Sequence, residues 1–323
     1  MMTPLKVICF TTLSCSMVSC GAVQLSDGDG GLGSAKVIEY DKKDYQNSVA
    51  SDWKLVWSDE FDSTVLDRTK WMPETSCWGG GNNEKQCYTD RPDNIQVRDG
   101  LLKLVAKPEP FTGLAMPQDF EDRGAEVTQP YTSGKIRTKS LASWTYGRFE
   151  ARIKLPQGQG TWPAFWMMSE HDVYGGWPLS GEIDIVESVN LGAQCSDCEG
   201  SDIENRSIAA LHFGKTWPNN QFKSAKPKLE DVTGFNTYAV EWSEGQIDWF
   251  VNDNKVFSLT SEQWFSSVVS KEINPHAPFD QPFYLMLNLA VGGNLSVSQN
   301  EKLFDPNSYP NALVVDWVRV YER

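Results

Sequence analysis

Positive charge is scarce in this sequence. Its 323 residues include 29 lysines and arginines against 43 aspartates and glutamates, which gives a formal net charge of −14. A surface this acidic repels anionic polymers, so we expect the chain to bind neither nucleic acid nor sulphated polysaccharides. The charge is better suited to a neutral substrate.

Helical periodicity is nearly absent, and no fixed-period repeat occurs. After residue 50, where all thirteen tryptophans lie, segments alternate between apolar and polar residues and end at glycine, proline, asparagine or aspartate. This pattern is typical of strands separated by turns. We therefore expect one all-β domain over residues 51–323, built from two packed antiparallel sheets. A short helix is expected only around residues 261–269, SEQWFSSVV.

The apolar run at residues 7–18 is too short to cross a bilayer as a mature helix. With Lys6 before it and small residues after it, residues 1–20 are expected to be a signal peptide. Residues 17–20, MVSC, resemble a bacterial lipoprotein box, which implies a lipid on Cys20 and an outer-membrane or cell-surface location. Ordinary cleavage and secretion is the alternative. Residues 21–50 are rich in glycine, serine and aspartate and are expected to be a flexible linker.

Cysteine is rare after the leader. Of seven cysteines, four remain there: Cys77, Cys87, Cys195 and Cys198. An even number in an exported chain suggests two disulfides. Joining sequence neighbours is the simplest of three possible pairings, and the sequence does not choose among them.

Acidic residues gather in one strand-like segment, GEIDIVES at residues 181–188. On a regular strand Glu182 and Asp184 would share a face, while Glu187 would point to the other. A β-bulge at Ile185-Val186 would return Glu187 to the first face. The two glutamate Cα atoms would then lie ~13 Å apart at ~3.3 Å per residue, which lets the carboxyl groups approach to ~5 Å.

That carboxyl separation is typical of retaining glycoside hydrolysis, in which one carboxylate attacks the sugar and the other serves as acid and then as base. Between the two glutamates, Asp184 would raise the proton affinity of the acid by like-charge repulsion and hydrogen-bond the nucleophile. The alternative for the spacing alone is a solvated sheet face with no chemical role.

The acidic segment resembles the signature of glycoside hydrolase family 16, in the subgroup with one residue inserted before the last glutamate. Other segments resemble the family in the expected order: LVWSDEF, GGGNNEKQCYTDRPDNIQV, YTSGKIRTK, YGRFEARIKLPQGQGTWPAFWMM, APFDQPFYLMLNLAVGG and VVDWVRVYE. Together they cover most of residues 53–323 and are most similar to bacterial laminarinases, which are endo-1,3-β-glucanases. The resemblance implies a β-jelly-roll sandwich with an open concave substrate cleft. It also implies that Glu182 is the nucleophile, Asp184 its assistant and Glu187 the general acid/base, with no cofactor for catalysis.

Tryptophan rings stack on the apolar faces of sugars, so three tryptophans are candidates for substrate binding. Trp162 and Trp166 are four positions apart and could share a strand face, next to the subsites before the scissile bond by family resemblance. Trp177 lies just ahead of the acidic segment. The remaining prominent tryptophans are expected in the core: Trp53, Trp71, Trp242, Trp249 and Trp317.

Three polar residues are further candidates for substrate binding. Asn83 lies in a glycine-rich loop, and Arg137 offers five donors to sugar hydroxyls. The alternatives are a turn asparagine and a surface ion pair. His212 is expected near the acid/base, where it could tune Glu187; a structural strand histidine is the alternative.

The resemblance also implies a structural calcium ion, held away from the cleft by Glu60, the Gly100 carbonyl and Asp316. Oxygen donors of this kind suit a hard cation. The expected substrate is a neutral, laminarin-like β-glucan, and the expected state is a monomer. Two alternatives stay open: a family 16 galactanase for agar, porphyran or carrageenan, and a non-catalytic glucan-binding protein.

Overall fold

The computed structural model describes residues 52–298 and 304–323. The predicted signal peptide, the lipidation site at Cys20 and the predicted linker over residues 21–50 lie outside these residues. Every strand among these described residues belongs to the unit Trp53–Arg323. Among the described helices, none is both long and apolar enough to cross a membrane.

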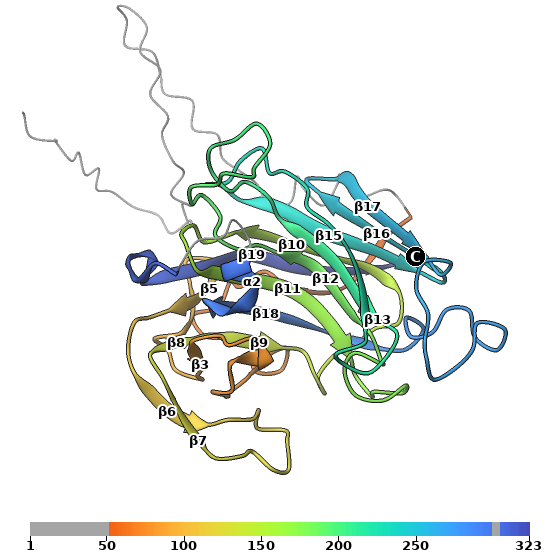
Figure 1. Ribbon diagram of the computed structural model, residues 1–323, viewed down its shortest axis with the longest axis horizontal. Helices are drawn as coiled ribbons and strands as arrows, with labels where there is room; N and C mark the ends of the chain where they lie inside the picture. The colour runs from red at the N-terminus through yellow and green to blue at the C-terminus, as the bar shows by residue number, and fades with distance from the viewer. Residues whose placement is uncertain (1–51, 299–303) are drawn as a thin grey trace, which may run out of the picture. The chain divides into compact units, whose positions relative to one another are not determined.

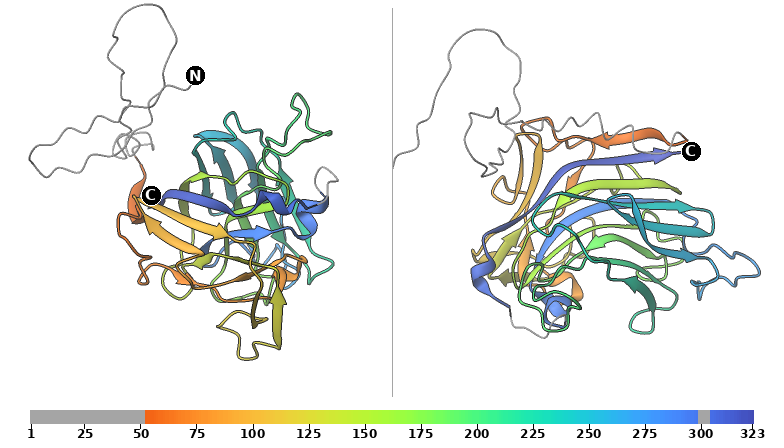
Figure 2. Two further views of the ribbon diagram at one scale, coloured as in Figure 1. Left: turned by 90° about the vertical axis from the view of Figure 1, so that its left-hand side faces the viewer. Right: turned by 90° about the horizontal axis from the view of Figure 1, so that it is seen from above.

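Two large sheets, built from antiparallel strand pairs, form the fold, as Figure 1 and Figure 2 show. Sheet A has the strand order β17 (Asn254–Thr260), β16 (Gln246–Val251), β15 (Asn236–Ser243), β10 (Gly147–Lys154), β19 (Asn311–Glu322), β5 (Leu101–Ala106) and β4 (Ile95–Arg98), with β1 (Lys54–Asp59) also paired to β19. Sheet B has the order β14 (Gln221–Ala225), β13 (Ile208–Phe213), β12 (Glu182–Glu187), β11 (Thr161–Ser169), β18 (Phe283–Val291), β9 (Lys135–Arg137) and β2 (Met72–Pro73). The predicted two-sheet, all-β architecture is confirmed.

The remaining elements are short. Two small strand pairs join β3 (Gln86–Tyr88) to β8 (Tyr131–Ser133) and β6 (Phe111–Leu114) to β7 (Glu126–Gln129). The β6–β7 hairpin extends away from the two sheets in Figure 1. The helical segments are η1 (Gly79–Gly81), α2 (Gly293–Ser298) and η2 (Pro306–Ser308).

The core lies between the sheets because their strands alternate. In β5, every second side chain is buried, as expected for a strand with one face in the core. Strand β18 is buried along its whole length, since it lies inside sheet B and both of its faces are covered. Four of the tryptophans predicted for the core are at most 1% exposed: Trp71, Trp242, Trp249 and Trp317. Trp53 was predicted wrongly, because it is only half-buried near the chain end, with the Arg323 guanidinium 4.5 Å from its ring.

The helix predicted for residues 261–269 is wrong; the segment forms turns. Trp264 is buried there, with its ring 5.3 Å from Phe279 and its indole Nε1 donating to the His276 carbonyl. These contacts hold the segment against the core in an irregular path. The α-helix of the described residues, α2, begins at Gly293 and has the sequence GNLSVS. These are mostly weak helix formers, so composition did not indicate the helix.

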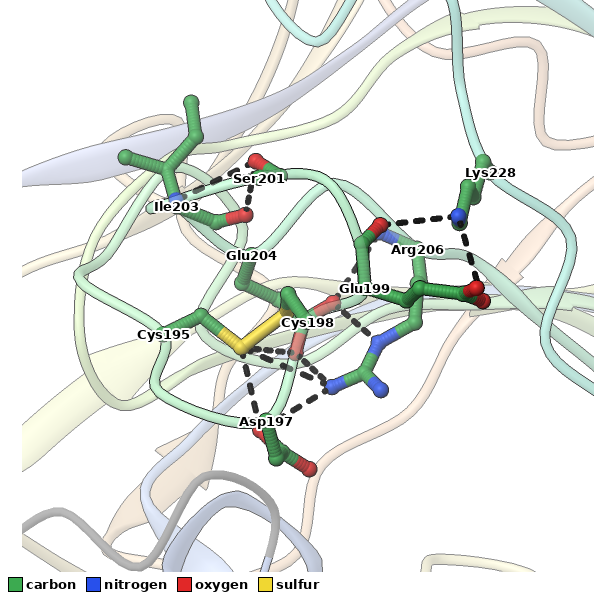
Figure 3. Close-up of a disulfide and its surroundings, with 9 residues drawn as sticks. All are labelled: Cys195, Asp197, Cys198, Glu199, Ser201, Ile203, Glu204, Arg206 and Lys228. Atoms are coloured by element: carbon green, nitrogen blue, oxygen red, sulfur yellow. Dashed lines mark hydrogen bonds and ion pairs between the residues drawn. A yellow bond between two sulfur atoms is a disulfide. The ribbon is translucent and has the colours of Figure 1, made fainter.

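Both disulfides join sequence neighbours, Cys77 to Cys87 and Cys195 to Cys198. The simplest predicted pairing is therefore confirmed. Figure 3 shows the second disulfide beside Arg206, whose guanidinium donates to the buried carboxylate of Glu204. These contacts stabilise the long connection between β12 and β13.

Candidate active site

Strand β12 contains the bulge that the acidic spacing predicts. Against β13, Glu182 pairs with His212, Asp184 with Ala210 and Glu187 with Ile208. Between Asp184 and Glu187 the chain therefore advances three residues while its partner advances two, so β12 holds one extra residue.

The bulge brings the three acids to one face of sheet B. The residues that pair with them on β13 are His212, Ala210 and Ile208, which are spaced two apart and so share one face of the sheet. Directly opposed residues lie on the same face, so the three acids share that face too. The extra residue lies within Ile185-Val186, and both of these side chains are buried in the core between the sheets. The bulge therefore keeps Ile185 and Val186 on the core face of sheet B. It also places Glu187 on the opposite face, together with Glu182 and Asp184.

Glu187 is held by a tryptophan on the neighbouring strand. The Trp162 indole Nε1 donates to Glu187 Oε1 at 2.8 Å. A small apolar cluster lies alongside, made of Val189, Ile208 and Ala210, with Trp162 packed against it. Burial raises the pKa of Glu187 to about 7, although the Trp162 hydrogen bond favours the anion and works against that shift. Glu187 can therefore carry a proton near neutral pH.

Asp184 is fully buried between the two glutamates, at 1% exposure. Its main-chain carbonyl accepts from the Trp249 indole Nε1 at 2.8 Å, which ties the strand to sheet A. Burial raises the pKa of the Asp184 carboxyl well above its usual range, and the nearby charges of Glu182 and Glu187 raise it further.

His212 contacts Asp184: its Nε2 lies 3.3 Å from Asp184 Oδ2. One carboxylate oxygen of Glu182, one of Asp184 and a ring nitrogen of His212 all lie within 4.8 Å of one another. Burial lowers the pKa of His212, but the carboxylates of Glu182, Asp184 and Glu187 outweigh it and raise the pKa to about 10. A charged His212 ring lowers the pKa of Glu187 through space, while the direct contact of His212 is with Asp184.

Two of the predicted substrate-binding tryptophans touch the acids. Trp162 bonds to Glu187, as described above, and the Trp177 indole Nε1 donates to Glu182 Oε2. Trp177 is 43% exposed, so much of its ring is open to solvent. Trp166 lies opposite Asp184 on β11 and donates to Asn288 Oδ1 at 2.7 Å. All three tryptophans therefore lie at the carboxylate cluster.

Asn83 and Arg137 are not in the carboxylate cluster. Exposed Asn83 has a φ of 58° and donates through Nδ2 to Asn294 Oδ1 at 2.9 Å. Arg137 is 3% exposed, and its guanidinium is 2.7 Å from an Asp119 oxygen and 3.4 Å from a Glu74 oxygen. The surface ion pair considered for Arg137 is thus a buried one, and sugar contact by either residue stays a prediction.

Two residues at the site were missed by the sequence reasoning. Asn288 was signalled by its place as the polar residue within the apolar run LMLNLAV. Phe222, on β14, had no signal, because its position depends on the pairing of β13 with β14. There it lies opposite His212, with the two rings stacked at 5.6 Å.

The predicted calcium ligands lie on β19 or at the ends of two strands paired with it. Strand β1 pairs with β19 up to Asp59 opposite Val318, and β5 pairs up to Leu102 opposite Val315. Glu60 directly follows β1, and Gly100 directly precedes β5. The two registers therefore direct both residues toward Asp316 on β19.

The donor types at this place suit calcium. Both Glu60 oxygens accept from Arg319 at 2.9 Å, and Asp316 Oδ2 accepts from Arg152 at 2.6 Å. A calcium ion would share these carboxylates with two guanidinium groups, and the site stays a prediction.

The chain is similar to several known proteins. A family model described as "Beta-porphyranase A-D, GH16 domain" matches residues 53–323. The chain is 39% identical to the glucan endo-1,3-beta-glucosidase A1 of Niallia circulans over 83% of this chain, although the match spans only 38% of that protein. It is 38% identical to the beta-glucanase of Rhodothermus marinus, over 85% of this chain and 87% of that protein. The X-ray structure of the laminarinase from Rhodothermus marinus matches with a TM-score of 0.66 and 36% identity, over 84% of this chain and 97% of that chain. The predicted jelly-roll sandwich is confirmed by this likeness.

Proposed function

The chain belongs to glycoside hydrolase family 16, and we propose that it cleaves internal 1,3-β-glucosidic linkages of laminarin-type glucans with retention of anomeric configuration. The observation that carries the proposal is the bulge in β12, which turns Glu182 and Glu187 to one face. Two carboxylates on one face are what double displacement needs.

In the first step, a Glu182 oxygen attacks the anomeric carbon and forms a glycosyl ester. Glu187 gives its proton to the departing glycosidic oxygen. Its pKa of about 7 supports this role, because a carboxyl at its ordinary pKa would be ionised at neutral pH. The Trp177 indole bonds Glu182, which holds the nucleophile in place before attack.

In the second step, Glu187, now ionised, takes a proton from water, which attacks the ester and releases Glu182. Asp184 lies between the two glutamates, and burial together with their charges raises its pKa well above the usual range. In its protonated form it can donate a hydrogen bond to Glu182 while the ester breaks.

A neutral glucan is supported by the way carboxylates pair with the cations on and just after β9. Lys135 lies 5.1 Å from the Trp166 ring, and its ammonium is 3.1 Å from a Glu74 oxygen. Arg137 and Lys139 are each within 2.8 Å of an Asp119 oxygen. Since carboxylates already balance these cations, a sulphate group would gain little from them.

The second candidate is a galactanase, which the description of the matching family model favours. The two functions are separated by assaying reducing-sugar release from laminarin, mixed-linkage glucan, agarose and porphyran, with the wild type and Glu182→Gln side by side. We expect wild-type release from laminarin and almost none from the variant. Release from agarose or porphyran alone would refute the glucanase proposal, and undiminished release by the variant would refute Glu182 as nucleophile.

A further inference from the structure

One row of side chains runs from the acids to the edge of sheet B. Glu182 on β12 lies opposite His212 on β13, and His212 lies opposite Phe222 on β14. Strand β14 is the last strand of the sheet. Directly opposed residues share a face, so Phe222 lies on the same face as Glu182.

The aromatic rings along this row are in contact with one another. The His212 and Phe222 rings are stacked, with centroids 5.6 Å apart and an interplanar angle of 26°. The Trp177 ring is also near His212, with the two ring centroids 6.4 Å apart. Phe222 is 61% exposed and Trp177 is 43% exposed. The row therefore offers exposed aromatic surface that continues from the carboxylates.

This surface lies across β12 from the tryptophans expected to hold the sugar before the scissile bond. Trp162 and Trp166 are on β11, which flanks one side of β12, while β13 and β14 follow on its other side. A glucan that crosses the strands and is cleaved at β12 would place its departing half over β13 and β14.

We propose that Phe222, stacked on His212, is a platform for a sugar ring of the departing half of the glucan. An exposed aromatic ring with a rigid partner behind it matches the apolar face of a pyranose. The inference rests on the proposed function, since it takes the glucan as substrate and Glu182 and Glu187 as the cleaving pair. Because an acceptor sugar would occupy the same place, Phe222 would also favour transfer of the glycosyl group to a second glucan.

The test compares two kinds of substrate, one with sugars on the departing side and one without. Laminarin and laminarihexaose carry sugars on both sides of the cleaved bond, whereas an aryl β-laminaribioside releases only a phenol. For Phe222→Ala we expect kcat/KM on laminarin and laminarihexaose to fall by about five- to tenfold, which is the range that ring stacking accounts for. On the aryl laminaribioside, kcat/KM should stay as in the wild type. The fraction of transfer products with added laminaribiose should also fall.

Three further variants complete the test. Phe222→Trp should restore activity on laminarin because it restores a flat ring, while Phe222→Leu should behave like Phe222→Ala. Lys223→Ala is the matched control, since Lys223 is the next residue on the same exposed strand but pairs with Leu211, whose side chain lies in the core on the other face. It should change neither substrate's kcat/KM.

Two results would overturn the inference: equal losses on both substrates, or no loss on either. If the wild type cleaves no laminarin at all, the proposed function fails first, and the inference fails with it. A melting temperature for each variant identifies any loss that comes from unfolding.

Discussion

Replacing Trp162 with phenylalanine should move the alkaline limb of the pH–activity profile to higher pH. The Trp162 indole Nε1 donates to Glu187 Oε1 at 2.8 Å, and this bond favours the ionised carboxylate. Phenylalanine keeps an aromatic ring but removes the donor. The anion of Glu187 is then less stable, its pKa rises, and the group keeps its catalytic proton to a higher pH.

The size of the effect follows from the strength of that bond. A hydrogen bond to a charged group contributes about 1.5–3 kcal/mol, and about 1.4 kcal/mol corresponds to one pH unit. Water can replace part of the lost hydrogen bond at a half-buried carboxylate, so the lower end of this energy range applies. We expect the limb, set in the wild type by a Glu187 pKa of about 7, to move upward by about one pH unit.

The assay is kcat/KM on laminarin as a function of pH, because this ratio reports the pKa values of the free enzyme. Trp166→Phe is the control: its indole Nε1 donates to Asn288, so its loss should leave the limb in place even if KM rises. A limb that stays in place in Trp162→Phe, or that moves to lower pH, would refute the role given to this hydrogen bond.

Three more predictions concern stability. Burial lowers the pKa of His212, but the nearby carboxylates outweigh burial and raise the pKa from 6.5 to about 10. The charged form of His212 therefore stabilises the fold. This stabilisation is complete below pH ~6.5 and is lost as the pH rises toward ~10. In urea unfolding, the stability difference between the wild type and His212→Gln should therefore shrink between about pH 6 and about pH 10, and a constant difference would contradict the assignment. Replacing both Cys77 and Cys87 with alanine should lower the free energy of unfolding by about 2–3 kcal/mol. The disulfide restricts the unfolded chain, and the effect is at the lower end because the closed loop is short. Equal stability of the variant and the wild type would show that other contacts hold the loop. If Glu60, Gly100 and Asp316 bind calcium, EGTA should lower the melting temperature while kcat/KM at room temperature is unchanged, and identical melting curves would exclude the site.

The features that sequence predicted best are those set by local spacing. Alternation predicted the strands, and the offsets of Glu182, Asp184 and Glu187 predicted the bulge, because a bulge is the way a strand returns a third acid to the first face. The disulfides that form are the simplest of the three pairings that the cysteine spacing allows.

Features that depend on strand register could not be predicted from spacing. Which tryptophan bonds which glutamate depends on how β11 and the loop before β12 meet the acids. Phe222 reaches the site only through the pairing of β14 with β13. Arg137 is buried because Asp119, from the connection between β6 and β7, comes to meet it, and nothing in the local sequence indicates that contact.

The most direct test of the account is to trap the glycosyl-enzyme. In an activated 2-deoxy-2-fluoro β-laminaribioside the fluorine slows both steps, while the good leaving group speeds the first step again. The ester should therefore accumulate and be found by mass spectrometry of proteolytic peptides. We predict one added 2-fluoro-laminaribiosyl group on Glu182, and no adduct in Glu182→Gln. An adduct on another carboxylate, or hydrolysis that produces the inverted anomer with no adduct, would contradict the claim that the bulge sets Glu182 and Glu187 against one glycosidic bond.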